Sequence, residues 1–256
     1  MRRFIRILSN FIVKFRRAIK RHGIIGLFLV TAERIAVLAN NLRPSIRREI
    51  SMREKRAAEF DLQYGVDTAG FIHPTELSIN HPNQVHAVSY RGSDSELFRK
   101  AIGTLSIDHR RFIFIDFGSG KGRAVLLAKE FPFKKIVGVE LSKELHAIAQ
   151  DNLKRFCSQI SRCGDVELLC ADAVAYPLPD DCLVCYFCNP FDATLMARMV
   201  LNIHESFSRN PREIFFVYYN AKEGHLLDSS DFFKSIETIG SVRIWQATQS
   251  SAGFGE

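Results

Sequence analysis

The sequence predicts an α/β protein, with a doubly wound, mostly parallel sheet that follows an N-terminal helical arm. From about residue 96, apolar segments of strand length alternate with segments of helical character. Near-continuous apolar strands separated by helices indicate a parallel sheet that is covered on both faces. The segment before residue 59 is instead basic and favours helix. We therefore expect an arm at residues 1–58 and a folded domain at 59–256, with its core at 96–220.

The elements of this domain follow from the apolar segments in chain order. Strands are expected at 112–117, 135–140, 166–170, 182–188 and 213–220, with a sixth at 242–247. Helices are expected at 121–130, 142–156 and 193–208. Ser142 should cap the second of these helices, because a serine hydroxyl in that position accepts a hydrogen bond from the first helical turn.

Positive charge is concentrated in the arm. The chain carries a net charge of +7, but residues 1–56 hold 15 Lys and Arg against 3 acids, which gives +12. The other 200 residues hold 20 bases and 25 acids, which gives −5. A slightly acidic body is a poor surface for a nucleic acid, so we expect any anionic partner to meet the arm.

Residues 1–20 have the pattern of an amphipathic helix with a basic face. Its apolar stripe consists of Phe4, Ile5, Leu8, Phe11, Ile12, Phe15 and Ile19. The apolar run that follows is too short and interrupted to span a bilayer, and a secretory signal peptide is not expected. Three interpretations remain open: a lid packed on the domain, a helix lying on an anionic membrane surface, or an attachment to nucleic acid or an organelle presequence.

Three of the six cysteines have the spacing Cys182-x-x-Cys185-x-x-Cys188, which superficially suggests metal or iron–sulfur ligation. Side chains alternate between the two faces of a strand, so Cys185 should point away from the other two. We therefore expect buried thiols in a reducing compartment, and no metal site. Histidines in a Pro-rich stretch are expected to be solvated: His73, His81 and His86.

A glycine-rich loop after the first strand is the main candidate for ligand binding. Its sequence is Asp116-Phe-Gly118-Ser-Gly120-Lys-Gly122-Arg123. Glycines at alternate positions let the backbone turn sharply and approach a ligand closely. The loop lacks the GxxxxGK pattern of a phosphate-binding loop, and Arg123 replaces the last glycine of the dinucleotide pattern GxGxxG.

Acidic residues at three strand ends indicate which kind of ligand this loop binds. Asp116 would repel a pyrophosphate and attract an ammonium group. Glu140 ends the second strand, where a carboxylate can accept hydrogen bonds from both ribose hydroxyls. Asp172 follows the third strand and can accept from an adenine amino group. Together they predict a nucleoside with a cationic amino-acid tail, which is S-adenosylmethionine.

These motifs carry a resemblance to a known family. Residues 112–191 resemble the class I S-adenosylmethionine-dependent methyltransferases, which implies a Rossmann-like sheet. The pattern is close to Ile115-Asp-Phe-Gly-Ser-Gly-Lys-Gly-Arg123 followed by Gly138-Val-Glu140. The usual sheet of this family closes with a seventh, antiparallel strand, for which residues 248–256 are a poor candidate. More narrowly, residues 60–220 resemble a group of bacterial methyltransferases of unassigned substrate.

The resemblance also implies a role for each residue of the motif. The residues that would hold the cofactor, in order from its methionine end to its adenine, are Asp116, Gly118, Gly120 and Gly122, then Glu140, then Asp172 and Ala173.

The fourth strand ends on Asn189-Pro190-Phe191, which resembles the (Asp/Asn)-Pro-Pro-(Phe/Tyr) element of methyltransferases that act on amino or amide nitrogens. That resemblance implies that Asn189 and the next carbonyl accept hydrogen bonds from the target N–H, while Phe191 stacks on a planar substrate. This chain has a single proline, and an Asn here can also cap the next helix. At the end of the fifth strand we select Tyr219 as a second catalytic candidate, and Tyr90 could close over the cofactor.

The predicted reaction is methyl transfer from S-adenosylmethionine to an acceptor nucleophile. We expect the acceptor to be nitrogen in a protein side chain or a small molecule, and a nucleic acid is least expected. The expected location is the cytoplasm, with the arm able to reach the inner membrane surface. The alternative is a non-catalytic cofactor-binding or membrane-recruited interaction module, because a fold does not fix its function. The intact set of Asp116, glycines and Glu140 disfavours that alternative.

Overall fold

A computed structural model describes residues 44–77, 81–156 and 161–248. The chain divides into two compact units, Met1–Arg53 and Glu54–Glu256. The helix predicted at residues 1–20 lies outside the described residues. None of the helices in the described ranges has both the length and the apolar character needed to cross a bilayer.

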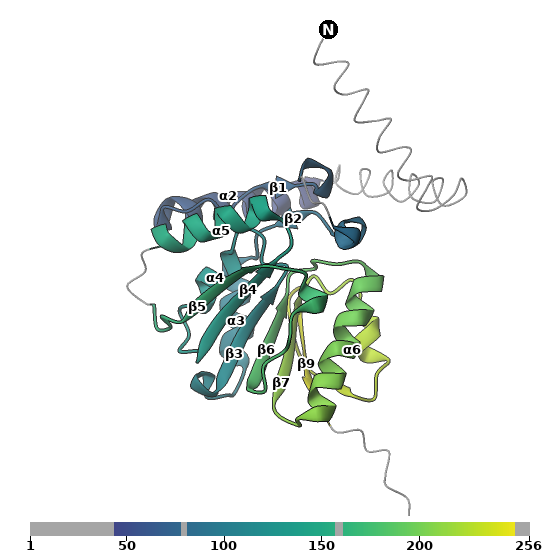
Figure 1. Cartoon of the computed structure of the whole chain (residues 1–256). Coiled ribbons are helices and arrows are strands. Elements are labelled where there is room, and N and C mark those ends of the chain that lie inside the picture. The colour runs from purple at the N-terminus through teal and green to yellow at the C-terminus, as the bar shows by residue number, and fades with distance from the viewer. Residues whose placement is uncertain (1–43, 78–80, 157–160, 249–256) are drawn as a thin grey trace, which may run out of the picture. The chain divides into compact units, whose positions relative to one another are not determined.

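The second unit is built on a seven-stranded sheet with the order β5-β4-β3-β6-β7-β9-β8 (Figure 1). Its strands are β3 (Phe112–Phe117), β4 (Lys135–Glu140), β5 (Val166–Cys170), β6 (Cys182–Phe187), β7 (Ile214–Tyr219), β8 (Phe233–Ile239) and β9 (Val242–Ala247). β3 to β7 pair in parallel, and β9 runs antiparallel between β7 and β8. The five predicted parallel strands are confirmed to within one residue at each end. Strand order reverses beside β3, which places the expected ligand cleft at the carboxyl ends of β3 and β6.

The antiparallel edge differs from the sequence prediction. Residues 242–247 form a strand as expected, and this strand, β9, is the last of the seven in chain order. The strand of this sheet that sequence analysis missed is β8, which precedes β9 in the chain and lies at the edge of the sheet. The sequence does not predict β8, because five of its seven positions are exposed and its sequence FKSIETI lacks a continuous apolar run. A two-residue connection, Gly240-Ser241, joins β8 to β9, and Gly240 adopts the positive φ that such tight hairpins favour.

Helices cover both faces of the sheet. Side chains of α3 (Ser95–Thr104) and α4 (Arg123–Ala128) belong to one apolar cluster, and those of α6 (Ala193–Arg209) belong to the cluster on the opposite face (Figure 1). The remaining elements are α2 (Pro44–Tyr64), α5 (Lys143–Arg155), α7 (His225–Asp228), the short strands β1 (Phe71–Ile72) and β2 (Tyr90–Arg91), and the 3-10 turns η1 (Pro74–Glu76), η2 (Pro82–His86), η3 (His109–Arg111) and η4 (Ala173–Ala175). The Ser142 cap of α5 is confirmed, since its side chain accepts a hydrogen bond from Leu145 N–H.

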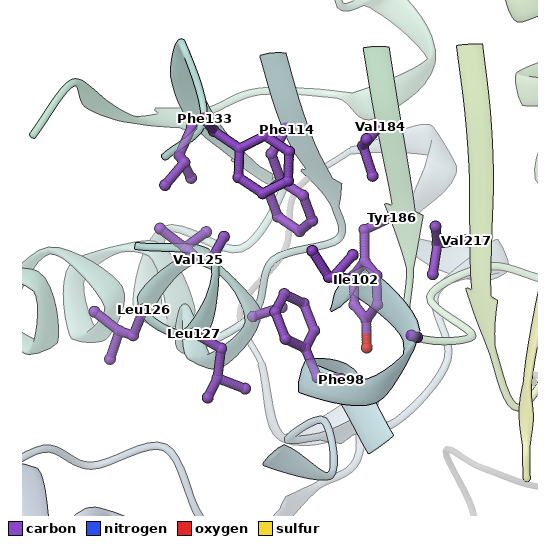
Figure 2. Packing of buried hydrophobic residues seen from close by; sticks show 14 of the residues in the cluster. Phe98, Ile102, Phe114, Val125, Leu126, Leu127, Phe133, Val184, Tyr186 and Val217 are labelled. Carbon is purple, nitrogen blue, oxygen red and sulfur yellow. The ribbon is translucent and has the colours of Figure 1, made fainter. Parts of the chain in front are cut away.

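Aromatic side chains anchor the cluster between the sheet and α3. Figure 2 shows Phe98 of α3 facing Tyr186 of β6 and Phe114 of β3, and the three rings are fully buried. Ring centroids of Phe98 lie 5.1 Å from Tyr186 and 5.8 Å from Phe114, in edge-to-face contacts. Burying one such side chain stabilises the fold by about 2–3 kcal/mol. This packing fixes α3 and the strand that leads into the glycine loop.

Candidate cofactor and acceptor site

The glycine loop bends sharply at the carboxyl end of β3. Gly118, Gly120 and Gly122 have φ values of +79°, +55° and +86°, a conformation that side chains of L-residues rarely adopt. Backbone N–H groups of Gly118 and Ser119 both donate to the carbonyl of Val139, which folds the loop against β4. A Cβ atom added at Gly118 would lie 2.4 Å from Cβ of Pro190. The loop therefore needs glycine for its backbone angle and for close contact with the strand end of β6.

Asp116 is a buried acid at the carboxyl end of β3. It is 2% exposed and lines the cavity beside the loop. Among the residues that the structure describes, none donates a hydrogen bond to its carboxylate. Burial raises the pKa of Asp116 well above its usual value, and the charge of nearby Glu140 raises that pKa further. A carboxylate in this position is suited to a cationic ligand, which would offset both effects.

Glu140 is fixed by backbone donors that leave room for a ligand. Its Oε2 accepts from Gly120 N–H at 2.8 Å and its Oε1 accepts from Ser142 N–H at 2.7 Å. Burial raises the pKa of Glu140, and these N–H groups partly offset the rise. Each carboxylate oxygen can accept a second hydrogen bond. The side chain is thus held in one orientation with acceptor capacity for the two hydroxyls of a ribose.

Asp172 and Ala173 also line this cavity. Asp172 Oδ1 accepts from Val174 N–H at 3.1 Å, and its Oδ2 accepts from the side-chain amide of Asn83 at 2.8 Å. Ala173 is buried and begins η4. Asn83 was not identified from the sequence.

One cavity unites most of the predicted site residues. The predicted residues that line it are Tyr90, Asp116, Gly118, Gly120, Glu140, Asp172, Ala173, Pro190 and Phe191. Gly122, Asn189 and Tyr219 are not among its lining residues. Gly122 instead packs against α5, since a Cβ there would lie 3.2 Å from Cβ of Ala149.

Asn189 is held by a tyrosine other than the one we selected. It has a φ of +47°, is 8% exposed, and accepts a hydrogen bond at its Oδ1 from the hydroxyl of Tyr218 at 3.2 Å. Burial raises the pKa of Tyr218, so this hydroxyl stays protonated and able to donate. The ring of Tyr219 belongs to the apolar cluster on the opposite face of the sheet. Strand alternation thus assigns Tyr218, rather than Tyr219, to the side of Asn189.

Residues 81–93, which we call the cover segment, contribute Asn83 and residues 87–93 to the lining of the cavity. Val88 N–H donates to the Pro190 carbonyl at 3.2 Å, and Ala87 forms a β-bridge with Phe191. The ring of Tyr90 lies against Gly120, where an added Cβ would approach it to 2.3 Å, and its hydroxyl donates to the Thr68 carbonyl at 2.6 Å. The cover segment therefore contacts both the glycine loop and the Asn189-Pro190-Phe191 element.

Two of the histidines expected to be solvated have structural partners. His81 caps η2, where its Nδ1 accepts from Asn83 N–H at 3.2 Å. His86 Nδ1 lies 2.8 Å from Asp192 Oδ2, which joins the cover segment to the start of α6. The expectation of solvated side chains is wrong for these two, because both are partly buried: His81 caps a turn of its own segment, and His86 contacts the residue that caps α6. The cysteines alternate as expected: Cys185 lies in one apolar cluster, while Cys182 and Cys188 pack against the other.

Buried basic residues of the glycine loop form a second feature that sequence analysis missed. Arg123 is 3% exposed and donates to Thr68 Oγ1 at 2.6 Å and to Asp61 Oδ1 at 3.1 Å. Lys121 is 7% exposed and its Nζ lies 2.7 Å from Asp67 Oδ1. A buried charge requires a partner. Two basic residues in this buried loop therefore indicate that acidic residues from another segment pack against the loop. The segment that precedes the cover segment supplies them.

Replacing Gly118 with Ala should lower the free energy of unfolding by roughly 3 kcal/mol, because the new methyl group meets Pro190 in a backbone conformation unfavourable to Ala. Gly103 is the matched control: it lies in α3 with no atom within 4 Å of an added Cβ. Gly103→Ala should raise the free energy of unfolding by about 0.5–1 kcal/mol. Urea denaturation measures both values, and equal changes in the two variants would contradict the assigned role of Gly118.

Comparison with known proteins identifies the domain. A family model described as a methyltransferase domain matches residues 114–209, which include the glycine loop, Glu140, Asp172 and Asn189. A comparison with curated proteins finds no match.

Several solved structures resemble the fold at low identity. An RNA methyltransferase from Salinibacter ruber in complex with S-adenosyl-L-homocysteine is 13% identical, with 64% of this chain and 97% of that chain covered and a TM-score of 0.44. A magnesium protoporphyrin IX methyltransferase from Synechocystis PCC 6803 is 13% identical, with 60% and 81% covered and a TM-score of 0.42. A ribosomal protein L11 methylase from Lactobacillus delbrueckii subsp. bulgaricus is 14% identical, with 60% and 77% covered and a TM-score of 0.41. Likeness at this level assigns no acceptor to this chain.

The family match and the site agree on the cofactor. The matched residues include the glycine loop with its buried acid, the acid that ends β4 and the acid after β5, all at the carboxyl edge of a mostly parallel sheet. The chain therefore contains a class I S-adenosylmethionine-dependent methyltransferase domain.

Proposed function

We propose that this methyltransferase transfers the methyl group to a nitrogen nucleophile of a protein side chain or a small molecule. The observation that carries the proposal is Asn189, whose carboxamide is fixed by Tyr218 beside the cavity that holds Asp116 and Glu140. A fixed amide at this strand end is suited to orient an N–H group. The slightly acidic body supports a small or peptide acceptor over a nucleic-acid duplex.

The residues of the cavity fit the cofactor in three places. Asp116 would attract the ammonium group, Glu140 would accept from the ribose hydroxyls, and Asp172 with Ala173 would lie beside the adenine. Bound S-adenosylmethionine would supply a methyl group on a positively charged sulfur; the acceptor would take this methyl group, and the neutral thioether S-adenosylhomocysteine would be the leaving group. The contribution of the protein is then mainly to position the acceptor, because such a displacement needs alignment more than acid–base chemistry.

Asn189 and the Pro190 carbonyl would provide that alignment. Each oxygen already accepts one hydrogen bond, from the Tyr218 hydroxyl and from Val88 N–H, and each can accept a second from the target nitrogen. Phe191 lines the cavity and would pack against a planar acceptor. Hydrogen bonds that hold the nitrogen by its N–H groups leave its lone pair free to face the methyl carbon.

Calorimetry of the full chain with S-adenosylmethionine tests the cofactor assignment, and no binding by the folded protein would overturn it. Transfer of tritium from methyl-labelled cofactor into protein, small-molecule and nucleic-acid fractions of a cell extract then tests the acceptor class. Label in protein or small molecules supports the proposal, and label confined to nucleic acid contradicts it. Binding without transfer to any fraction would favour the non-catalytic alternative.

The basic amphipathic pattern of residues 1–20 supports a peripheral membrane role for the arm. We expect the full chain to bind vesicles that contain anionic lipid, and we expect a variant without residues 1–20 to bind at least tenfold more weakly, because about 1 kcal/mol is lost per basic residue near such a surface. Vesicle sedimentation measures the difference, with neutral vesicles as the control. Equal binding by both forms would favour the packed-lid interpretation of the arm.

A further inference from the structure

Asn83 of the cover segment lies at the adenine end of the proposed cofactor site. Its Nδ2 donates to Asp172 Oδ2 at 2.8 Å across 89 residues of sequence. Both side chains line the cavity, together with Ala173 and Glu140. Asn83 is therefore adjacent to the carboxylate proposed to accept from the adenine amino group.

The contact with Asp172 fixes which way the carboxamide faces. An ionised carboxylate has acceptors only, so Asn83 must present its amino group to Asp172. A flipped amide would instead bring two acceptor oxygens together. Among the described residues, none donates a hydrogen bond to Asn83 Oδ1. One acceptor oxygen and the second N–H of the amide thus remain for a ligand.

An amide that offers one acceptor oxygen and one N–H donor is complementary to the edge of adenine. A carboxamide binds adenine through two hydrogen bonds, accepting from the 6-amino group and donating to a neighbouring ring nitrogen. Hypoxanthine carries an oxygen at position 6, which would face Asn83 Oδ1 and the Asp172 carboxylate. Sites built to hydrogen-bond one group reject analogues that leave those hydrogen bonds unmade.

Asn83 is not required merely to hold the cover segment in place. Other contacts already attach this segment: Val88 N–H to the Pro190 carbonyl, Tyr90 to the Thr68 carbonyl, and His86 to Asp192. None of these three contacts involves Asp172, the carboxylate proposed to accept from the adenine amino group, whereas the carboxamide of Asn83 donates to it. Its position is thus better explained by ligand recognition than by attachment.

We propose that Asn83, oriented by Asp172, recognises the 6-amino edge of the cofactor adenine and sets the specificity of the site for adenine over hypoxanthine. The inference rests on the proposed cofactor site and adds to it a residue from outside the region that the family model matches. It makes the cover segment part of the binding site as well as its cover.

Calorimetry of the full chain with S-adenosylhomocysteine and with S-inosylhomocysteine, which differ at position 6 of the base, tests the proposal. The wild-type protein should prefer the adenine compound by at least a hundredfold. Asn83→Ala should reduce this preference about tenfold, mainly by weakening the adenine compound. Asn83→Ser, which keeps a small donor for Asp172 but lacks the carboxamide, should behave in the same way and serves if the Ala variant does not fold.

Val85→Ala is the matched control, because Val85 lies in the same 3-10 turn, is 55% exposed and does not line the cavity. It should keep the wild-type preference. An unchanged preference in the Asn83 variants would overturn the proposal and leave recognition to Asp172. Equal weakening of both compounds would also overturn it, since Asn83 would then act only in folding. Failure of the wild-type protein to bind S-adenosylhomocysteine would overturn the cofactor site itself, and the proposal with it.

Discussion

Replacing Asp116 with Asn should weaken S-adenosylmethionine binding by about a hundredfold while raising the melting temperature of the ligand-free protein. The loss of affinity follows because a buried charge that meets a ligand ammonium contributes about 2–5 kcal/mol, and each 1.4 kcal/mol is tenfold. The gain in stability follows because Asn removes a buried carboxylate that lies near Glu140 and has no donor among the described residues. Each kcal/mol gained raises the melting temperature by about 2–4 °C in a chain of this size.

The same residue should make both properties depend on pH. Burial and Glu140 raise the pKa of Asp116 in the folded protein, so the folded state holds a proton that the unfolded chain has already released. The stability that this bound proton contributes to the folded state is fully present below the ordinary Asp pKa, and it is lost as the pH rises through the raised pKa. Cofactor affinity has the opposite trend, because an ammonium group binds the ionised carboxylate: it should fall as the pH drops through the raised pKa.

Differential scanning calorimetry and titration calorimetry across this pH range measure the two effects. Asp116→Asn should flatten both pH profiles, although Glu140 will retain some dependence of its own. Asp231→Asn is the control, since Asp231 is exposed and lies outside the cavity lining. Wild-type affinity in Asp116→Asn would show that the ammonium group binds elsewhere.

The parallel core was predictable because its strands are buried on both faces. Each of β3, β4, β6 and β7 is an almost unbroken apolar run, and such runs have few alternatives to a covered parallel sheet. β8 gave no such signal, since an edge strand with exposed positions carries no continuous apolar pattern. The usable clue was the Gly240-Ser241 pair between two strand-length segments, which is typical of a two-residue hairpin.

The site was predictable where it depends on strand ends and unpredictable where it depends on contacts between distant segments. Asp116, Glu140 and Asp172 could be selected because each lies at, or just after, the carboxyl end of a predicted parallel strand. Asn83 meets Asp172 across 89 residues, and no local pattern encodes that contact. The two tyrosines of β7 illustrate the same limit: alternation separates their faces, but only the assembled sheet shows that Tyr218, in register with Phe187, lies on the side of Asn189.

Removing the carboxamide of Asn189 should reduce methyl transfer by a hundredfold or more and leave cofactor affinity within about threefold. A loss of this size is expected when an acceptor is displaced by about 1 Å from its reactive position. Cofactor affinity should persist because Asn189 does not line the cavity that Asp116, Glu140 and Asp172 share. Transfer of tritium to the accepting fraction measures turnover, and calorimetry with S-adenosylhomocysteine measures affinity.

Asn189→Ala changes two things at once: it removes the carboxamide, and it strains the backbone, because Asn189 has a φ of +47° that Ala tolerates poorly. Asn189→Gly removes the same carboxamide without that strain, so equal losses in the Ala and Gly variants would assign the effect to the side chain. Tyr218→Phe keeps Asn189 but frees its orientation, and should lower kcat by about tenfold with a smaller change in KM. Asn210→Ala, at the far end of α6, is the control. Wild-type turnover in Asn189→Gly would remove Asn189 from the mechanism, and the acceptor would then have to be oriented by Pro190 and Phe191 alone.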